Sequence, residues 1–246
     1  MEEKELLPRL RELAERCRAR SVPTATMFLT PREQAEAMAA SLPVRPVFFG
    51  GYEQAERRCA VFLPDYLTPE TMDPSLFLRA IHASAPFSSL THRDFLGSIM
   101  ALGIGRECVG DIVVRGEDCW FFVTPGIASH VLDSLIKVGR GGVSVEEIGF
   151  EQVPSFEEQL EPRSFTVQSL RLDAVLAGAF RISRSTCQEL LDAGEVNLNH
   201  LPCLDRDAPV EPGDLLSLRH HGRARVLTAD GRSKKGRIFV TVGIFK

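Results

Sequence analysis

The segment from residue 171 to residue 199 constrains the fold of this chain more than any other. Apolar residues recur at helical spacing from 170 to 176, and Ser183 stands where the N-cap of a second helix is expected. Gly194 is suited to end that helix in the left-handed conformation, and the apolar alternation of 196–198 then indicates a strand. The pattern predicts two short helices joined by a tight turn and followed by strands.

Polar and cationic side chains gather at the ends of these elements. Phosphate groups bind where backbone N–H groups, a helix dipole and arginine side chains converge, and the start of the second helix combines all three. The candidate RNA-binding residues are Arg171, Arg181, Ser183, Arg184, Ser185, Gln188, Asn199, His200, Arg219, Arg223 and Arg225. The alternative interpretation is a solvated helical hairpin with ordinary surface charge.

The charge distribution favours the first interpretation. The net charge of the whole chain is −4, which by itself argues against a nucleic-acid partner. Residues 170–246, however, hold 12 basic and 9 acidic side chains, against 17 and 24 in residues 1–169. From residue 219 onward, eight basic residues accompany Asp230 alone. A basic end on an acidic body is the electrostatic signature of a local phosphate-binding region.

The middle of the chain predicts a ferredoxin-like domain of the kind found in RNA-recognition motifs. The expected order is β-α-β-β-α-β, with elements at 76–83, 91–102, 109–114, 119–124, 127–138 and 143–148. Along the fourth element, Trp120 and Phe122 share one face, so an aromatic set can lie on an open sheet face or pack in the core. Core packing is favoured because the aromatic signature of the motif is not closely matched. Five basic residues could contact phosphates or remain solvated: Arg93, Arg106, Arg115, Lys137 and Arg140.

The first seventy residues predict a small α/β unit with no visible chemistry. A helical stripe runs from Leu6 to Cys17, and a capping box at 30–33 opens a helix that reaches about residue 42. Strands are expected at 44–49 and 59–63. The acidic, proline-containing segment 151–169 is typical of a linker.

Two stretches carry a resemblance to known families. The sequence RLDAVLAGAFRISRSTCQELLDAGEVNLN…VEPGDLLSLRHHGR, within residues 170–225, resembles the RNA-binding domain first described in ribosomal protein S4, the S4 domain. The sequence HRDFLGSIMALGIGRECVGDIVV, residues 92–114, resembles the middle part of the bacterial YlmH family, whose members carry such a module at the C-terminus. The two stretches together cover about half of the chain and occur in the order typical of that family.

The resemblance implies both a fold and a role. The fold class is α+β, with an N-terminal α/β domain (1–73), a ferredoxin-like middle domain (74–150), a linker (151–169) and an S4-like domain (170–246). The implied role is non-catalytic binding of rRNA and peptidyl-tRNA on the large ribosomal subunit, in rescue and quality control of stalled translation. A cytoplasmic monomer without cofactor or small-molecule substrate is expected.

The chain departs from the S4 pattern at two turns. Many S4 domains have glycine after the loop asparagine, where this chain has Asn199-His200. His220-His221 also stands where a compact Arg-Gly is common. Histidine is bulkier than glycine, so the first departure bears on the turn type and on how closely this loop approaches RNA.

No catalytic, metal or membrane motif emerges. Asp173 superficially resembles the catalytic aspartate of pseudouridine synthases but lacks their continuation, which favours a cap or salt-bridge role. The six cysteines form no CxxC pair, which indicates reduced thiols, and no run of about 18 apolar residues could span a bilayer.

Two alternatives to a ribosome-binding protein remain. One is an rRNA-modifying enzyme, a pseudouridine synthase or methyltransferase, that uses an S4-type module for targeting. The other is a regulatory protein whose first seventy residues bind a different partner.

Overall fold

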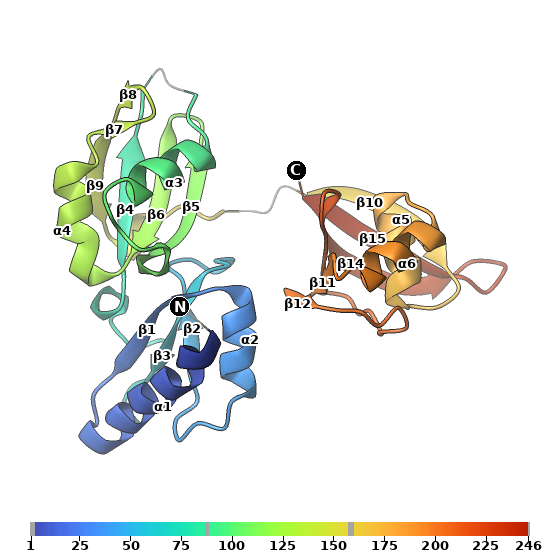
Figure 1. Ribbon diagram of the computed structural model, residues 1–246, viewed down its shortest axis with the longest axis horizontal. Helices are drawn as coiled ribbons and strands as arrows, with labels where there is room; N and C mark the ends of the chain where they lie inside the picture. The colour runs from blue at the N-terminus through green and yellow to red at the C-terminus, as the bar shows by residue number, and fades with distance from the viewer. Residues whose placement is uncertain (1–2, 87–88, 157–159, 246) are drawn as a thin grey trace. The chain divides into compact units, whose positions relative to one another are not determined.

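The computed structural model describes residues 3–86, 89–156 and 160–245, and the chain divides into two compact units, Met1–Phe156 and Glu157–Lys246 (Figure 1). The α+β class is confirmed, because helices and mostly antiparallel sheets occur in both units. The two domains expected within residues 1–150 share an apolar cluster and form one compact unit. None of the helices in the described ranges is long and apolar enough to cross a membrane.

The N-terminal part of the first unit is a three-stranded sheet, in the order β1-β3-β2, with two helices. Its elements are α1 (Glu3–Arg20), β1 (Thr24–Leu29), α2 (Pro31–Ala39), β2 (Val47–Phe49) and β3 (Arg58–Phe62). The predicted helical stripe is confirmed, because Leu6, Leu10 and Cys17 are buried in one apolar cluster with Phe62. The predicted capping box is also present: the Thr30 hydroxyl accepts a hydrogen bond from the Glu33 N–H (3.3 Å), and the Glu33 carboxylate accepts one from the Thr30 N–H (2.7 Å). Strand β1 was not predicted.

The second sheet of this unit has the order β5-β6-β4-β9, with all pairs antiparallel. Its elements are η1 (Pro74–Leu76), β4 (Arg79–Ser84), α3 (His92–Met100), η2 (Arg106–Cys108), β5 (Val109–Arg115), β6 (Asp118–Val123), α4 (Pro125–Ser134), β7 (Lys137–Val138), β8 (Gly141–Gly142), β9 (Ser144–Ile148) and η3 (Phe150–Gln152). Strands β4, β5, β6 and β9 with helices α3 and α4 follow the expected β-α-β-β-α-β order. Helices α3 and α4 pack on one face of the sheet, around Ile81, Phe95 and Phe121.

Two predicted boundaries in this sheet were wrong. The expected strand at 76–83 begins only at Arg79, because Asp73 caps a single 3-10 turn that Pro74 opens. The expected helix at 127–138 ends at Ser134, because residues 137–138 pair with residues 141–142 as a short β-ribbon.

The sheet face opposite α3 and α4 is covered by the chain itself. Phe122 is fully buried under the ring of Tyr52, with the ring centroids 5.5 Å apart. Trp120 lies 5.6 Å from Phe156, and the ring of Phe156 also meets that of Tyr52 at 5.0 Å. The aromatic set that shares this face therefore packs internally, as the weak RNA-motif signature indicated.

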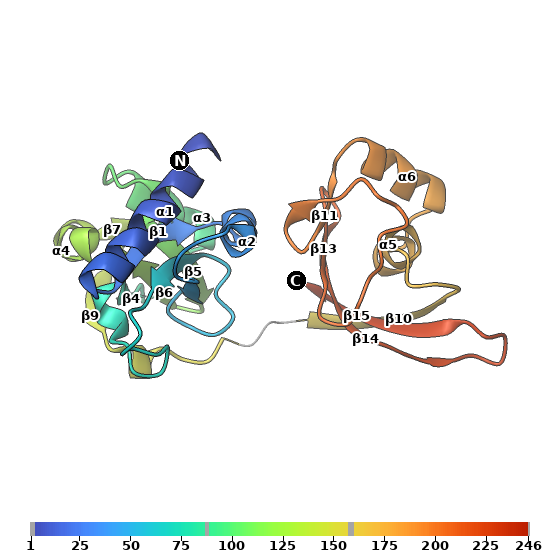
Figure 2. The same cartoon turned by 90° about the horizontal axis from the view of Figure 1, so that it is seen from below.

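The second unit is a six-stranded antiparallel sheet with two helices (Figure 2). Its elements are β10 (Leu160–Val167), α5 (Leu172–Phe180), α6 (Arg184–Asp192), β11 (Val196–Leu198), β12 (Leu201–Pro202), β13 (Leu215–Leu218), β14 (Gly222–Arg232) and β15 (Ile238–Phe245). The strand order is β10-β15-β14-β13-β11-β12. One apolar cluster joins the helices to one face of the sheet, with Leu176, Leu191, Leu216 and Val226 among its buried members.

The linker expected at 151–169 was wrong over Leu160–Val167. These eight residues form β10, which pairs with β15 along its whole length. The sequence of β10 is polar because β10 is an edge strand of the sheet. Edge strands also tolerate proline, which occurs here at position 162. Phe165 and Val167 nevertheless pack against the core, so β10 is part of the second unit.

Candidate nucleic-acid interface

The start of α6 is an exposed helix N-terminus flanked by two arginines. Ser183 is the N-cap, and its hydroxyl accepts a hydrogen bond from the Thr186 N–H at 3.0 Å. The first N–H groups of a helix have no intrahelical acceptor, so those of Arg184 and Ser185 remain at this end. The side chains of Arg181, Arg184 and Ser185 are exposed there. This end of α6 can bind an anion through backbone N–H groups, the helix dipole and two guanidinium groups.

The predicted Arg184 site requires a sharp change of direction between the two helices. Helix α5 ends at Phe180, and Arg181 adopts the left-handed conformation with φ of 55°. Non-glycine residues seldom adopt this conformation. It turns the chain at once into α6, so that the side chain of Arg181 lies just before the helix start that carries Arg184.

Arg171 is held by carboxylates at the start of α5. Its guanidinium pairs with Asp173 at 3.2 Å and also with Asp207. The hydrogen bonds that the Arg171 guanidinium donates to the Asp173 carboxylate raise the pKa of Arg171 above its ordinary value. Asp173 is buried, and its carboxylate offsets the positive charge of Arg171, which corresponds to the predicted salt-bridge role. Arg171 therefore orders the loop around Asp207 as well as presenting a positive charge.

Two further candidates hold the structure around the helices and the turn after β11. Gln188 on α6 donates to Asp192 at 2.9 Å and accepts from Arg206 at 3.2 Å. The Asn199 amide donates to Asp214 at 2.7 Å, and its oxygen accepts from the Leu215 N–H at 2.9 Å. Asn199 thus fastens the β11–β12 turn to the start of β13.

The unusual Asn199-His200 turn has a clear conformation. The φ angles are 51° and 67°, and the turn joins Leu198 directly to its partner Leu201. Positive φ at both central residues is what a type I′ hairpin turn requires. Histidine replaces the common glycine here without changing the two-residue length of the turn.

Of the remaining three candidates, Arg223 and Arg225 lie in β14 and Arg219 lies in the turn just after β13. Arg223 and Arg225 alternate along β14 with Ala224 and Val226, which are buried against α5 and α6. Alternate residues of a strand face opposite sides, so the two arginines lie on the open face. Both guanidinium groups stand over the ring of Phe245, at 4.7 and 5.8 Å from its centroid.

Arg219 lies at the edge of a hollow on this open face. The hollow has a volume of about 360 Å³ and is lined by residues of β11, β13 and the β13–β14 turn. The Arg219 guanidinium lies 3.9 Å from the Glu195 carboxylate. Apart from Asn199 and His200, which form the β11–β12 turn, the candidate residues divide into two surfaces. The helix surface consists of Arg171, Arg181, Ser183, Arg184, Ser185 and Gln188, and the strand surface consists of Arg219, Arg223 and Arg225.

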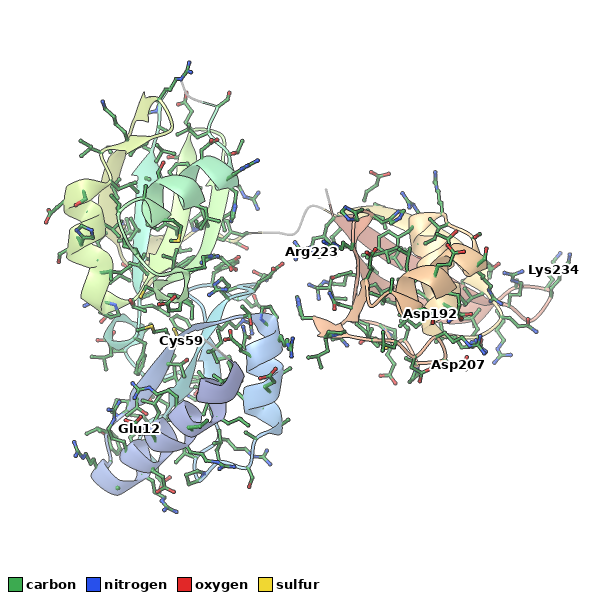
Figure 3. All side chains as sticks on the ribbon, viewed as in Figure 1. Glu12, Cys59, Asp192, Asp207, Arg223 and Lys234 are labelled. Carbon is green, nitrogen blue, oxygen red and sulfur yellow. The ribbon has the colours of Figure 1, made fainter. Side chains whose placement is uncertain are left out.

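Further basic residues of the second unit lie outside the candidate set: Arg206, and several residues around the β14–β15 turn. Arg206 joins the helix surface through its bond to Gln188, but it lies in a loop where no local pattern marks it. The turn between β14 and β15 carries three basic residues, Lys234, Lys235 and Arg237, and Arg232 stands just before it at the end of β14. Figure 3 shows Lys234 and Arg223 at opposite ends of the β14–β15 hairpin.

The five basic residues singled out in the middle domain differ in exposure and in their partners. Arg93, Lys137 and Arg140 are exposed. Arg106 instead donates hydrogen bonds to the carbonyl groups of Val109 and Gly110, and burial lowers the pKa of its guanidinium to about 10. The exposed Arg115 lies with its guanidinium 5.7 Å from the centroid of the Phe156 ring.

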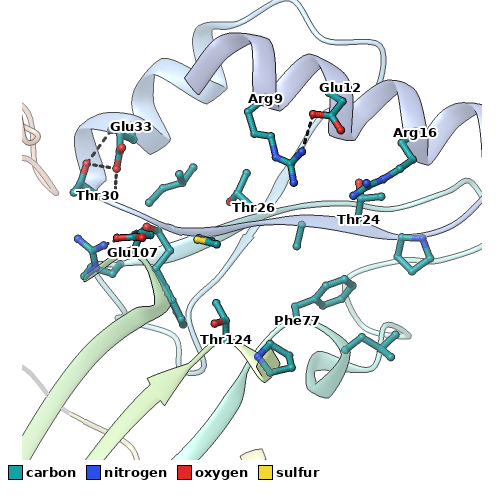
Figure 4. A pocket seen from close by; sticks show the side chains of 18 of the residues that line it. Arg9, Glu12, Arg16, Thr24, Thr26, Thr30, Glu33, Phe77, Glu107 and Thr124 are labelled. Atoms are coloured by element: carbon teal, nitrogen blue, oxygen red, sulfur yellow. Dashed lines mark hydrogen bonds and ion pairs between the residues drawn. The ribbon is translucent and has the colours of Figure 1, made fainter. Parts of the chain in front are cut away.

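A cavity of about 980 Å³ in the first unit follows strand β1 (Figure 4). Arg9 and Glu12 of α1 pair with each other at 2.7 Å along one side. Thr30 and Glu33 at its end are engaged in the capping box of α2. Within the described ranges, no three His, Cys, Asp or Glu side chains are placed to hold a metal ion.

The cysteine side chains are unsuited to nucleophilic chemistry where they are buried. Burial raises the pKa of the Cys187 thiol to about 11 and that of Cys59 to about 12. A thiol reacts as the thiolate, so both groups are inert near neutral pH. They pack as small apolar side chains in the cores of their units.

Comparisons with known proteins agree with the resemblance inferred from the sequence. A family model described as "Putative RNA-binding domain in YlmH" matches residues 69–152. A curated relative, ribosome-associated protein quality control protein P2 of Bacillus subtilis (strain 168), is 37% identical over 218 residues, which are 88% of this chain and 85% of the relative. A solved structure, cell division protein ylmH from Streptococcus pneumoniae, is similar with a TM-score of 0.50 at 26% identity, covering 63% of this chain and 96% of that chain. The chain therefore belongs to the YlmH family.

Proposed function

We propose that this protein binds RNA of the large ribosomal subunit, both rRNA and tRNA, and acts in the quality control of stalled translation in the cytoplasm. The observation that carries the proposal is the exposed start of α6, where Arg181 and Arg184 flank the first N–H groups of the helix. The name of the Bacillus subtilis relative, a ribosome-associated quality control protein, supports the same assignment. We propose a binding role without catalysis, because the candidate residues of the second unit are mainly cations and helix N–H groups, which suit phosphate binding.

The helix surface fits the backbone of folded RNA. Phosphate contacts position a protein on RNA, and arginine and helix N-termini are common donors for them. Arg171 and Gln188 are tied to Asp207 and Arg206, which fixes the loop beside α6 before RNA arrives. A preordered surface loses less side-chain entropy on binding.

Sedimentation with purified large ribosomal subunits tests the proposal. The wild-type chain is expected to pellet with the subunits, and the Arg181→Ala/Arg184→Ala variant is expected to remain largely in the supernatant. Unchanged sedimentation of the double variant would remove the helix surface from the contact.

Salt dependence provides a second test, directed at the β14–β15 turn. Charge reversal at Lys234 and Lys235 is expected to flatten the dependence of binding on salt concentration, since fewer counterions are released. An unaltered slope would show that this turn lies away from the RNA.

A further inference from the structure

The open face of the second unit contains a hollow that the proposed helix surface does not use. It has a volume of about 360 Å³, near the lower end of the roughly 300–1,000 Å³ typical of small-molecule sites. Arg219 and His220 line it from the β13–β14 turn, and Asn197, Ser217 and Arg223 line it from the strands. We propose that this hollow binds an unpaired nucleotide of an RNA strand.

The placement of the polar residues follows from the strand register. Asn197 pairs with Ser217 across β11 and β13, and Ser217 pairs with Arg223 across β13 and β14. Residues directly opposite each other in a sheet face the same side, so the amide, hydroxyl and guanidinium groups form one row. Their neighbours Val196, Leu216 and Leu218 instead lie in the core under the helices, so the row occupies the opposite face of the sheet.

The charges around the hollow suit a phosphate at its rim. Arg219 and Arg223 supply two positive charges, while Glu195 is the single acidic residue of the lining and faces Arg219 at 3.9 Å. The stacking of Arg223 on Phe245 holds its planar guanidinium in a defined orientation. Planar guanidinium groups bind phosphate through paired hydrogen bonds and stack on nucleobases.

The neutral groups of the hollow suit the edge of a base. An amide offers both donors and an acceptor, and a hydroxyl offers a donor and acceptor positions, so Asn197 and Ser217 can match a base edge. Base edges are paired inside an A-form duplex and become accessible in loops, bulges and single strands. The occupant is therefore an unpaired nucleotide rather than a duplex backbone.

The hollow and the start of α6 lie on opposite sides of the same sheet. The second unit can therefore hold a structured RNA on its helix surface and a single-stranded segment on its strand surface at the same time. This inference rests on the proposed RNA-binding function, but it concerns a separate set of residues.

Binding of a twelve-nucleotide oligouridine to the full-length protein tests the inference. The Arg219→Ala/Arg223→Ala variant is expected to lose at least tenfold in affinity for this probe. The Arg11→Ala/Arg45→Ala variant removes the same charge from exposed positions of the first unit and serves as the matched control. Equal affinity of the two variants would overturn the inference, as would failure of the wild-type protein to bind the probe.

Crosslinking keeps the test valid if a variant folds poorly. An oligouridine that contains 4-thiouridine is expected to crosslink the wild-type protein within residues 194–223. Crosslinks confined to residues 181–188 would overturn the hollow as the binding site. Large-subunit sedimentation distinguishes the two ideas: wild-type sedimentation without oligouridine binding contradicts the hollow and leaves the proposed function in place.

Discussion

Substitution of Arg184 by alanine separates RNA binding from folding more cleanly than any other change at the interface. Arg184 is the first residue of α6, and its side chain is exposed and makes no ion pair within the described part of the chain. A cation at a helix N-terminus opposes the helix dipole, typically by 0.3–1 kcal/mol. Arg184→Ala is therefore expected to leave the free energy of unfolding unchanged or slightly raised.

The effect on binding has the opposite sign. A hydrogen bond to a charged group contributes about 1.5–3 kcal/mol. Since 1.4 kcal/mol is about a tenfold change in affinity, Arg184→Ala is expected to weaken large-subunit binding roughly tenfold to hundredfold. The surface substitution Arg45→Ala, in the exposed loop before β2, removes the same charge and is expected to change affinity far less.

The assay is sedimentation of the protein with large subunits over a range of subunit concentrations, together with urea unfolding of each variant. The reasoning predicts weaker sedimentation with an unchanged unfolding midpoint. Equal affinities for Arg184→Ala and Arg45→Ala would refute it, and so would a loss of binding that follows a loss of stability.

Three further predictions concern the stability of the second unit. Ser183→Ala should lower its free energy of unfolding by about 1 kcal/mol because the N-cap bond is lost, and Ser183→Asp should restore it, as urea unfolding can show. Gly178→Ala should destabilise the unit despite the higher helix propensity of alanine, because the added Cβ would lie 2.2 Å from the ring of Phe165; a gain in stability would contradict the packing of β10 on α5. Burial raises the pKa of Cys187 to about 11, against 9.0 in the unfolded chain, so the unfolded state loses this proton first as the pH rises. The free energy of unfolding of the unit should therefore be highest below pH 9 and fall between pH 9 and pH 11, as urea unfolding at several pH values can show. The same decline in Cys187→Ala would exclude this cause.

The helix starts were predictable because capping is local. Thr30, Thr91 and Ser183 each accept a hydrogen bond from an N–H group three residues later, so the residues that define each start are adjacent in the sequence. Gly194 likewise ends α6 with φ of 71°, as its position predicts. These features depend on backbone chemistry within a single turn.

The edge strands were not predictable from local pattern. Residues 160–167 become a strand only because 238–245 lie beside them, some eighty positions later in the chain. An edge strand is partly solvated, so its sequence lacks the strong apolar alternation of a central strand. Strand β1 is also at the edge of its sheet and was not predicted, although most of its residues are buried.

The sequence identified the candidate residues of the interface, but it could not show that they divide into a helix surface and a strand surface. The local motif identified Arg184 and Arg223 together, whereas the sheet places them on opposite sides. That division depends on the pairing of β13 with β14 and on the burial of Ala224 and Val226 under the helices. The pairing of Arg171 with Asp207 likewise joins residues 36 positions apart, beyond the reach of any motif.

The most direct test of the account is a cryo-EM map of the full-length protein bound to the large ribosomal subunit. The account predicts that the start of α6, with Arg181 and Arg184, lies against RNA phosphate groups. A map in which the protein is bound while this end of α6 faces solvent would contradict the central claim.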